Sequence, residues 1–437
     1  MNNDIRAVAA AARDASRLLA AENTSRKNAA LAAVAEHLEA EKQAILAANH
    51  KDMEAAEANG LAAPLLKRLR FDEAKLTEAI RGIHSVITLP DPVGLVQEVR
   101  ELDEGLVLKR VGCPIGVIGM VFESRPDALV QIASLCLKSG NAVLLKGGSE
   151  ARETNKALAA AISHGAESAG MPSGWIGLLE TRQDVGVMLA LDDDIDLIIP
   201  RGSNEFVKHI MDTTRIPVLG HADGICHVYV DAAADIDMAL RIVADSKTQY
   251  VAVCNAAETL LVNQEIADRF LPELATTLSE RGVKLRGCEL TRKYLPGIEA
   301  AGEADWQTEY LDYILAVRVV GDLEAAVTHI NRYGSGHTDA IVTTHTETAN
   351  LFMDRVDSAS VMWNCSTRFA DGFRYGLGAE VGISTVKVHA RGPVGLEGLC
   401  TYKWRLRGAG HVVADYSGPH ARPFTHRTIA SAEADSI

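Results

Sequence analysis

Apolar residues recur at two different spacings along this chain of 437 residues, and the change of spacing marks out its elements. Over residues 4–59 the apolar positions repeat every three or four residues, which predicts two helices ending at Gly60. We expect Ser25 to cap the second of them. A further helix is predicted over about 72–87, where the prolines of 89–92 end it.

From residue 98 the apolar spacing shortens to two. This pattern predicts a hairpin over 98–111 with its turn at Glu104-Gly105. Strands and helices then alternate with short turns, which requires a parallel sheet with helical crossovers. The strands are predicted over 115–121, 142–146, 175–179, 195–199 and 217–219, and the helices over 126–138, 150–169, 185–191 and 204–211.

A second alternation begins at 227, so the sequence predicts an α/β fold divided into two domains near Gly224. Its strands are predicted over 227–230, 258–262, 314–320 and 339–343, and its helices over 235–247, 264–281 and 323–332. The segment 396–413 is an extended strand without a partner nearby, and the 98–111 hairpin lacks one too. Paired together they would form a flap that reaches another subunit.

Composition narrows the class of protein. Hydrophobic residues make up 47% of the chain and charged residues 23%, as in ordinary globular proteins. The net charge of −14 argues against a nucleic-acid partner, and neither a signal peptide nor a run long enough to span a membrane is present. Seven isolated cysteines favour reduced thiols in the cytoplasm. The spacing of His329 and His337 fits no zinc pattern, so no metal is expected.

Two glycine turns follow predicted buried strands of the first sheet. Glycines let the backbone approach an anion, and the helix N-terminus that follows offers free N–H groups. We therefore expect a phosphate or ribose site at this edge, although a plain glycine turn with a solvated lysine is the alternative. The residues are Lys146, Gly147, Gly148 and Ser149 in the first turn and Arg201, Gly202 and Ser203 in the second.

Cys254 stands between the helix predicted over 235–247 and the strand predicted over 258–262, with small residues beside it. A thiol on such a non-helical connection is open to a substrate, as a nucleophile requires. The alternative is a buried cysteine that packs as a small hydrophobe. The local pattern alone leaves both interpretations open.

Loops rich in arginines and hydroxyls suit a carboxylate or phosphate ligand. Arg125 follows the strand predicted over 115–121, where its alternative role is an ion pair with Glu123 or Asp127. The loop 364–372 adds two hydroxyls and a second arginine, which could equally be structural. The candidates for substrate binding are Arg125, Ser366, Thr367, Arg368 and, in the loop that follows, Glu380.

Several motifs together resemble one known family. The strongest lies within 320–341 and contains His329-Ile-Asn-Arg-Tyr-Gly-Ser-Gly-His-Thr-Asp339; the others lie at 200–202, 224–227, 254–255, 364–369, 376–380 and 389–393. On these residues the chain resembles, from about residue 5 to about 415, the γ-glutamyl phosphate reductases of the aldehyde dehydrogenase superfamily. It departs from the family pattern at 249–253, at Cys365 and at Phe373-Arg374. The last of these changes could alter substrate contacts, and none of them affects the thiol itself.

The resemblance implies an aldehyde-dehydrogenase-like α/β fold. We expect a Rossmann-type cofactor domain (1–97 and 113–224), a catalytic domain (225–395), a small β oligomerisation flap (98–112 and 396–415) and a disordered tail (416–437). The resemblance further implies that Cys254 is the nucleophile and that NADPH lies near Lys146 and Arg201. It also implies a homo-oligomer and a functional link to glutamate 5-kinase, which would supply an acyl phosphate.

The expected chemistry is reduction of L-glutamate 5-phosphate through a thioester on Cys254, with hydride from NADPH. The segment 218–224 lacks the glutamate that activates water in hydrolytic relatives, which fits an acyl group leaving as an aldehyde. We expect the Cys254 N–H and Asn255 to stabilise the oxyanion and the site to lower the thiol pKa. The alternatives are an acylating dehydrogenase that uses another donor, such as a CoA thioester, and a non-catalytic scaffold of the same fold.

Overall fold

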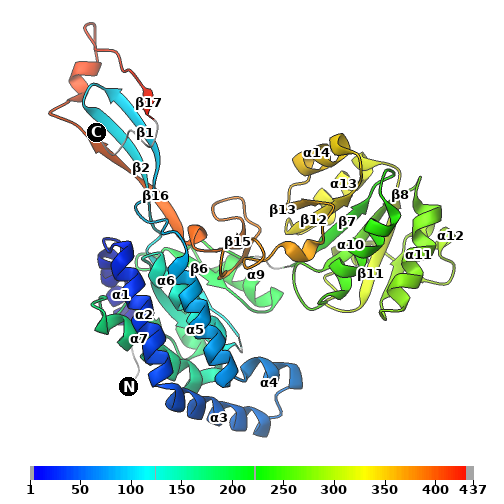
Figure 1. Cartoon of the computed structure of the whole chain (residues 1–437), viewed down its shortest axis with the longest axis horizontal. Coiled ribbons are helices and arrows are strands. Elements are labelled where there is room, and N and C mark those ends of the chain that lie inside the picture. The colour runs from blue at the N-terminus through cyan, green and yellow to red at the C-terminus, as the bar shows by residue number, and fades with distance from the viewer. Residues whose placement is uncertain (1–3, 124, 221–222, 430–437) are drawn as a thin grey trace.

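The computed structural model describes residues 4–123, 125–220 and 223–429. Two parallel sheets, each flanked by helices, stand apart in Figure 1, and a long β flap projects from the first of them. This arrangement confirms the predicted α/β class. Among the described helices, none is both long and apolar enough to cross a membrane.

The first sheet has the strand order β5-β4-β3-β6, and all its pairings are parallel. Every residue of β3 and β4 is buried, as the continuous apolar runs predicted. The strands are β3 (Val117–Val121), β4 (Ala142–Lys146), β5 (Ile176–Leu178) and β6 (Leu197–Pro200), and the helices that connect and cover them are α6 (Pro126–Lys138), α7 (Arg152–Ser168), α8 (Arg182–Met188) and α9 (Asn204–Thr213). The strand predicted over 217–219 is only a single bridge between Val218 and Ile198.

The second sheet has the order β10-β9-β11-β8-β7-β12-β13 and is also parallel. Its strands are β7 (Cys226–Val230), β8 (Ala257–Asn263), β9 (Lys284–Gly287), β10 (Glu299–Ala300), β11 (Ile314–Val320), β12 (Thr338–Val342) and β13 (Ser360–Trp363). Its helices are α10 (Ile236–Thr248), α11 (Ala267–Ser279), α12 (Glu289–Tyr294), α13 (Leu323–Tyr333) and α14 (Thr346–Arg355). The sequence did not predict β9, β10, α12, β13 or α14, because each is short or lacks clear periodicity.

The flap joins distant parts of the chain, as predicted. Strand β16 (Cys400–Arg407) pairs along its whole length with β2 (Leu106–Pro114), which forms a hairpin with β1 (Val96–Asp103). The predicted disordered tail is wrong for part of its length. Strand β17 (Arg427–Ile429) pairs with β1, and Arg422 forms an ion pair of 2.9 Å with Asp103. These contacts fold the chain beyond residue 415 back onto the flap.

The N-terminal region differs in detail from the sequence prediction. Three helices, rather than two, precede Gly60: α1 (Ile5–Leu19), α2 (Thr24–Ala40) and α3 (Lys42–Ala58). Asn23 caps α2, because its side chain accepts the Arg26 N–H at 2.9 Å, so the prediction of Ser25 as the cap is wrong. Helices α4 (Ala63–Leu69) and α5 (Glu73–Thr88) follow. As the sequence predicted, α5 ends just before the prolines of 89–92.

The core of the first sheet extends beyond the boundary predicted from the sequence. Val381, Val394 and Leu399 pack into it, next to the short strands β14 (Gly382–Ser384) and β15 (Gly392–Val394). By its packing the segment 381–399 therefore belongs with the first sheet, although the sequence placed most of it in the second domain.

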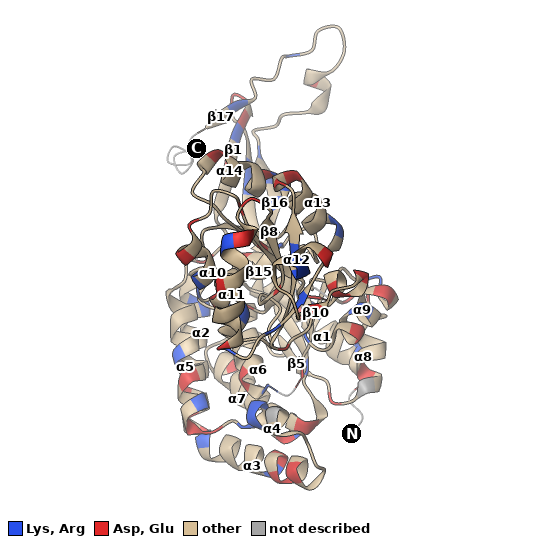
Figure 2. Ribbon diagram, turned by 90° about the vertical axis from the view of Figure 1, so that its right-hand side faces the viewer, with Lys and Arg blue, Asp and Glu red and all other residues tan. Residues whose placement is uncertain are grey.

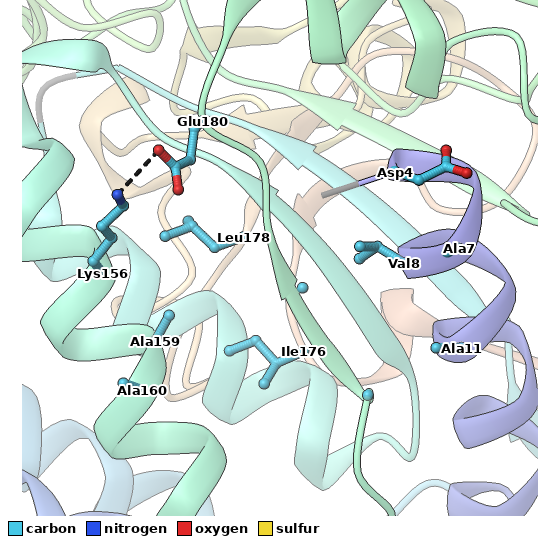
Figure 3. Close-up of a pocket in the computed structure, with 12 residues that line it drawn as sticks. Asp4, Ala7, Val8, Ala11, Lys156, Ala159, Ala160, Ile176, Leu178 and Glu180 are labelled. Atoms are coloured by element: carbon cyan, nitrogen blue, oxygen red, sulfur yellow. Dashed lines mark ion pairs between the residues drawn. The ribbon is translucent and has the colours of Figure 1, made fainter. Parts of the chain in front are cut away.

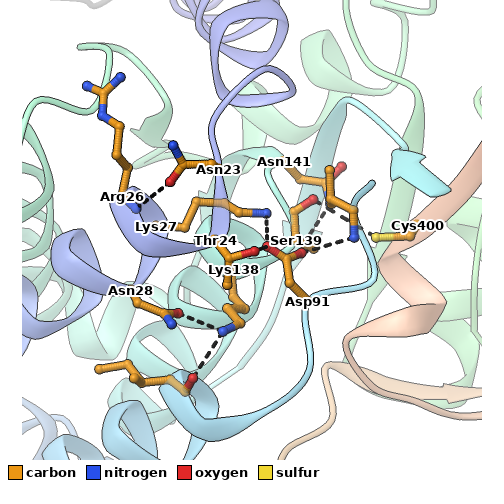
Figure 4. Close-up of polar contacts among 12 residues, drawn as sticks. Asn23, Thr24, Arg26, Lys27, Asn28, Asp91, Lys138, Ser139, Asn141 and Cys400 are labelled. Carbon is orange, nitrogen blue, oxygen red and sulfur yellow. Dashed lines mark hydrogen bonds and ion pairs between the residues drawn. The ribbon is translucent and has the colours of Figure 1, made fainter. Parts of the chain in front are cut away.

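A buried polar cluster joins the N-terminal helices to the first sheet (Figure 4). Lys27 of α2 is inaccessible to solvent and forms an ion pair of 2.6 Å with Asp91 in the loop after α5. Lys138 at the end of α6 donates to Asn28 at 2.6 Å and to the carbonyl of Ile87. The cluster fixes the helical layer against the parallel sheet.

Candidate active site

Three strands of the first sheet end level with one another. Val121 at the end of β3 pairs with both Lys146 of β4 and Pro200 of β6. The turns that follow these strands therefore emerge side by side at one edge of the sheet, where open α/β sheets bind ligands.

The amino edge of the second sheet faces this carboxyl edge. Cys254 comes directly before β8, so it lies at the amino end of that strand and is partly exposed. The side chain of Asn204, at the start of α9, donates a hydrogen bond of 2.9 Å to Glu309 in the domain of the second sheet. This bond joins the two edges. The candidate site is thus built between the two sheets.

Two residues before and within β7 hold the nucleophile segment. A Cβ on Gly224 would lie 2.4 Å from the Cα of Cys254, so only glycine fits there. The thiol of Cys226 donates to the Cys254 carbonyl at 3.2 Å and lies 3.7 Å from His337 Nδ1. The motif at 224–227 therefore positions the backbone of Cys254.

Asn255 and the loop at 366–370 clamp the segment from the other side. The Asn255 side chain donates to the Ala370 carbonyl at 2.8 Å, and its own carbonyl accepts from Thr367 Oγ1 at 2.7 Å. Ser366 Oγ accepts from Ser246 Oγ at 3.2 Å. Asn255, Ser366 and Thr367, which the sequence predicted as site residues, are all buried. Their contacts hold the segment that carries Cys254 in position.

Arg201, in the second glycine turn, lies within electrostatic reach of the Cys254 thiol. Its Nη2 is 4.0 Å from a carboxylate oxygen of Glu380, whose other oxygen accepts the Gly372 N–H at 2.8 Å. Burial lowers the pKa of Arg201, and the charges of Glu380 and Cys254 act against that shift. The cofactor-binding role predicted for Arg201 stays a prediction.

Two further predicted arginines flank the same space. Arg368 is buried, donates to Gln249 at 2.9 Å and interacts electrostatically with Cys254. Arg125 is more exposed and pairs with Asp127 at 3.4 Å, the alternative role foreseen from the sequence. Glu380 and Arg201 both experience the charge of Arg125, so the guanidinium groups of the site act on common neighbours.

The environment of Cys254 raises its pKa to about 12, first through burial and then through the charges of Glu309 and Glu380. Arg201 opposes this shift but does not reverse it. The expectation of a lowered thiol pKa is therefore wrong for the unliganded protein, because removal from water and two carboxylates outweigh the cation. Burial likewise raises the pKa of Glu380, which makes it a candidate proton acceptor.

Glu309 is a site residue that the sequence did not reveal. It lies in an irregular segment between Gln307 and Ile314, where no periodicity or motif points to it. Its position becomes evident only from its bond to Asn204, which also donates to Asp223 at 2.7 Å. Residues 221 and 222, within the segment that lacks the hydrolytic glutamate, lie outside the described residues.

The first glycine turn presents groups that can donate hydrogen bonds to a phosphate. A Cβ on Gly147 would lie 2.1 Å from Asn155 Nδ2, so the backbone turns tightly against α7 there. Lys146 is buried and donates to the Gly147 carbonyl, whereas Ser149 is exposed. At the second turn Gly202 and Ser203 are exposed, and Ser203 immediately precedes α9. An ammonium, hydroxyls and a helix N-terminus are the donors that phosphates take.

A hollow away from this site lies on the domain built around the first sheet. It has a volume of about 560 Å³ and runs along edge strand β5, between α1 and α7 (Figure 3). Lys156 and Glu180 form an ion pair of 3.0 Å at its rim. Neither glycine turn nor Cys254 lines this hollow. The candidate active site is therefore the space between the two sheets.

Comparisons with known proteins agree with this geometry. Residues 1–286 match the model of the aldehyde dehydrogenase family. The γ-glutamyl phosphate reductase of Pelotomaculum thermopropionicum is 61% identical over 98% of both chains. The γ-glutamyl phosphate reductase of Acetivibrio thermocellus is 62% identical over 95% of this chain and 96% of its own.

Solved structures show the same likeness. The crystal structure of γ-glutamyl phosphate reductase from Thermotoga maritima superimposes with a TM-score of 0.92 at 40% identity, covering 94% of this chain and 100% of that one. An acetylating aldehyde dehydrogenase from Geobacillus thermoglucosidasius shares the fold at 16% identity, with a TM-score of 0.63 and coverage of 94% and 97%.

Proposed function

Because the chain belongs to the γ-glutamyl phosphate reductase family of the aldehyde dehydrogenases, we propose that it reduces L-glutamate 5-phosphate to L-glutamate 5-semialdehyde and phosphate. This reaction is the second step of proline biosynthesis from glutamate. The observation that carries the proposal is the position of Cys254 at the amino end of β8, between the two sheets and within electrostatic reach of Arg201 and Arg368. A thiol among guanidinium groups suits attack on an anionic acyl donor.

Cys254 attacks as a thiolate, which forms when its proton passes to a base. Glu380 is our candidate for this base, because burial raises its pKa and so strengthens it as a proton acceptor. The sulfur attacks the acyl carbon, the carbon–oxygen bond to phosphate breaks, and a thioester forms on Cys254. Arg201 and Arg368 would hold the negative charge of the substrate and of the departing phosphate.

A nicotinamide dinucleotide, held by the glycine turns after β4 and β6, would supply the hydride chemistry that reduction of this thioester requires. The carbon–sulfur bond then breaks, the aldehyde leaves, and Cys254 returns as a thiolate. The Cys254 segment is held on both sides, by Gly224 and Cys226 and by Thr367, which fixes the backbone that carries the sulfur.

The reductase activity of the family implies a nicotinamide cofactor, and we propose that it is NADPH. Lys146, Gly147, Gly148 and Ser149 would hold it, with Gly202 and Ser203 at the neighbouring turn. The buried ammonium of Lys146 at the end of β4 favours a cofactor with an additional phosphate. We assign the protein to the cytoplasm as a homo-oligomer, in functional connection with the glutamate 5-kinase that makes its substrate.

An assay of semialdehyde oxidation tests the proposal. The wild-type enzyme should reduce NADP⁺ faster than NAD⁺ and only when inorganic phosphate is present. Cys254→Ala should reduce kcat by at least about 10⁴-fold, because it removes the nucleophile. Turnover that requires coenzyme A in place of phosphate would point to an acylating dehydrogenase with another donor. Retained activity in Cys254→Ala would overturn the assignment of the nucleophile.

A further inference from the structure

A large cleft leads to the nucleophile segment from the side of the N-terminal helices. It has a volume of about 1180 Å³. Helices α4 and α5 form one wall, and the segment immediately before the nucleophile, including Val253, forms another together with Gly378 and Ala379. Arg125 and Asp127 also line the cleft. The cleft therefore connects solvent with the chain next to Cys254.

The cleft is positive, although the protein as a whole is negative. Four cations line it, and they come from α4, α5 and the start of α6: Lys67, Arg68, Lys75 and Arg125. Only Glu78 and Asp127 oppose them, so the lining carries 4 − 2 = +2 whereas the chain carries −14. Lys67 and Arg68 are exposed, and Lys75 donates to the Arg68 carbonyl at 3.3 Å. In Figure 2 the basic residues of α4 are drawn in blue.

We propose that this cleft is the route of the phosphate group, and that Lys67, Arg68 and Lys75 attract anions toward Cys254. The inference rests on the proposed function, which supplies an acyl phosphate as substrate and inorganic phosphate as product. In the reverse reaction a phosphate oxygen attacks the thioester carbon, the carbon–sulfur bond breaks, and the sulfur leaves as a thiolate. Clefts lined by charge of one sign can raise association rates 10- to 10³-fold.

The cofactor is a less suitable occupant of the cleft. Neither the first glycine turn (Lys146–Ser149) nor the second (Arg201–Ser203) contributes to its lining. We therefore assign the three cations to the phosphate group and not to the dinucleotide.

The first test measures the semialdehyde reaction in a variant carrying Lys67→Gln, Arg68→Gln and Lys75→Gln. At low ionic strength the KM for phosphate should rise about tenfold and its dependence on salt should weaken. The semialdehyde has no net charge, so its KM should stay within about twofold of the wild-type value. The KM for NADP⁺ should also stay within about twofold, because the cofactor is not assigned to the cleft. An unchanged phosphate KM, or a shift confined to NADP⁺, overturns the proposal. The matched control changes Lys51, Arg281 and Lys293, all exposed and outside the cleft, to Gln.

The second test does not depend on the reaction. Alkylation of Cys254 by anionic iodoacetate and by neutral iodoacetamide is followed by peptide mass spectrometry. The ratio of the iodoacetate rate to the iodoacetamide rate should fall about three- to tenfold in the triple variant and stay constant in the control. An unchanged ratio overturns the proposed role of the cleft. If the wild-type enzyme shows no phosphate-dependent activity, the proposed function fails while this ratio still tests the cleft.

Discussion

At the sulfur of Cys254, burial and two carboxylates act against one nearby cation. The result is a thiol whose pKa rises to about 12 before any ligand binds. Such a thiol is protonated at neutral pH and reacts slowly with adventitious electrophiles. The structure therefore favours a nucleophile that becomes reactive when a base and an anionic substrate are both in place, in preference to a permanently ionised one.

This pKa predicts the alkylation profile of the unliganded enzyme. Because the thiolate is the reactive form, the rate with iodoacetamide should rise about tenfold per pH unit from pH 7 to 10 without a plateau. Replacing Glu309 with Gln removes a negative charge that raises the pKa of the thiol. The rate at pH 8 should then increase about three- to tenfold, since a shift of one pKa unit is worth a factor of ten.

The exposed Glu289 on α12 provides the control, and Glu289→Gln should leave the alkylation rate unchanged. A plateau near pH 8.5 in the wild-type enzyme, the range of a free thiol, would contradict the account of the environment of Cys254.

Sequence patterns located Cys254, both glycine turns and the arginine loops, since each has a recognisable residue type at an element boundary. They could not locate Glu309, because its contact with Asn204 joins residues 105 positions apart. Nor could they show that Arg201 lies within electrostatic reach of the thiol. The register of β6 with β3 and the approach of the second sheet decide that position, and neither is encoded locally.

At the scale of elements, long periodic segments were predicted well and short ones were missed. Strand β4 and helix α6 have the predicted bounds, since buried apolar runs and a proline at the helix start define them. Helix α4 was missed because its seven residues hold too little periodicity. The break between α2 and α3 was also missed, because Ala- and Glu-rich sequence continues through it.

The buried pair Lys27–Asp91 should fix the N-terminal helices on the first sheet. Asp91→Asn would leave the ammonium of Lys27, which is 0% exposed, without an anionic partner. We expect a loss of about 3–5 kcal/mol in the free energy of unfolding, measured by urea denaturation. Asp14→Asn removes the exposed pair with Arg17 and should cost less than about 1 kcal/mol. Equal losses in the two variants would contradict this role.

At the scale of the whole molecule, the flap leaves an apolar surface uncovered. Strand β16 is an edge strand of the flap sheet, and residues from 401 to 407 are exposed along it. Tyr402, Trp404 and Leu406 alternate with basic residues, so they lie on one face of the strand. An exposed edge with an apolar face is typical of a surface that another subunit covers.

Trp404→Glu combined with Leu406→Glu should therefore shift the protein to smaller assemblies, because the charges oppose burial of this face. Light scattering after size exclusion measures the change. Leu18→Glu, at an exposed apolar position on α1, is the matched control and should leave the mass unchanged. An unchanged mass in the flap variant would contradict the proposed interface.

In the proposed mechanism Cys254 forms a thioester that reacts with phosphate or hydride and not with water. Rapid mixing of the wild-type enzyme with semialdehyde and NADP⁺ in the absence of phosphate measures this directly. We expect a burst of one equivalent of NADPH per active site, an acyl group on Cys254 by mass spectrometry, and renewed turnover once phosphate is added. Continuous NADPH formation without phosphate, or the same burst in Cys254→Ala, would contradict this mechanism.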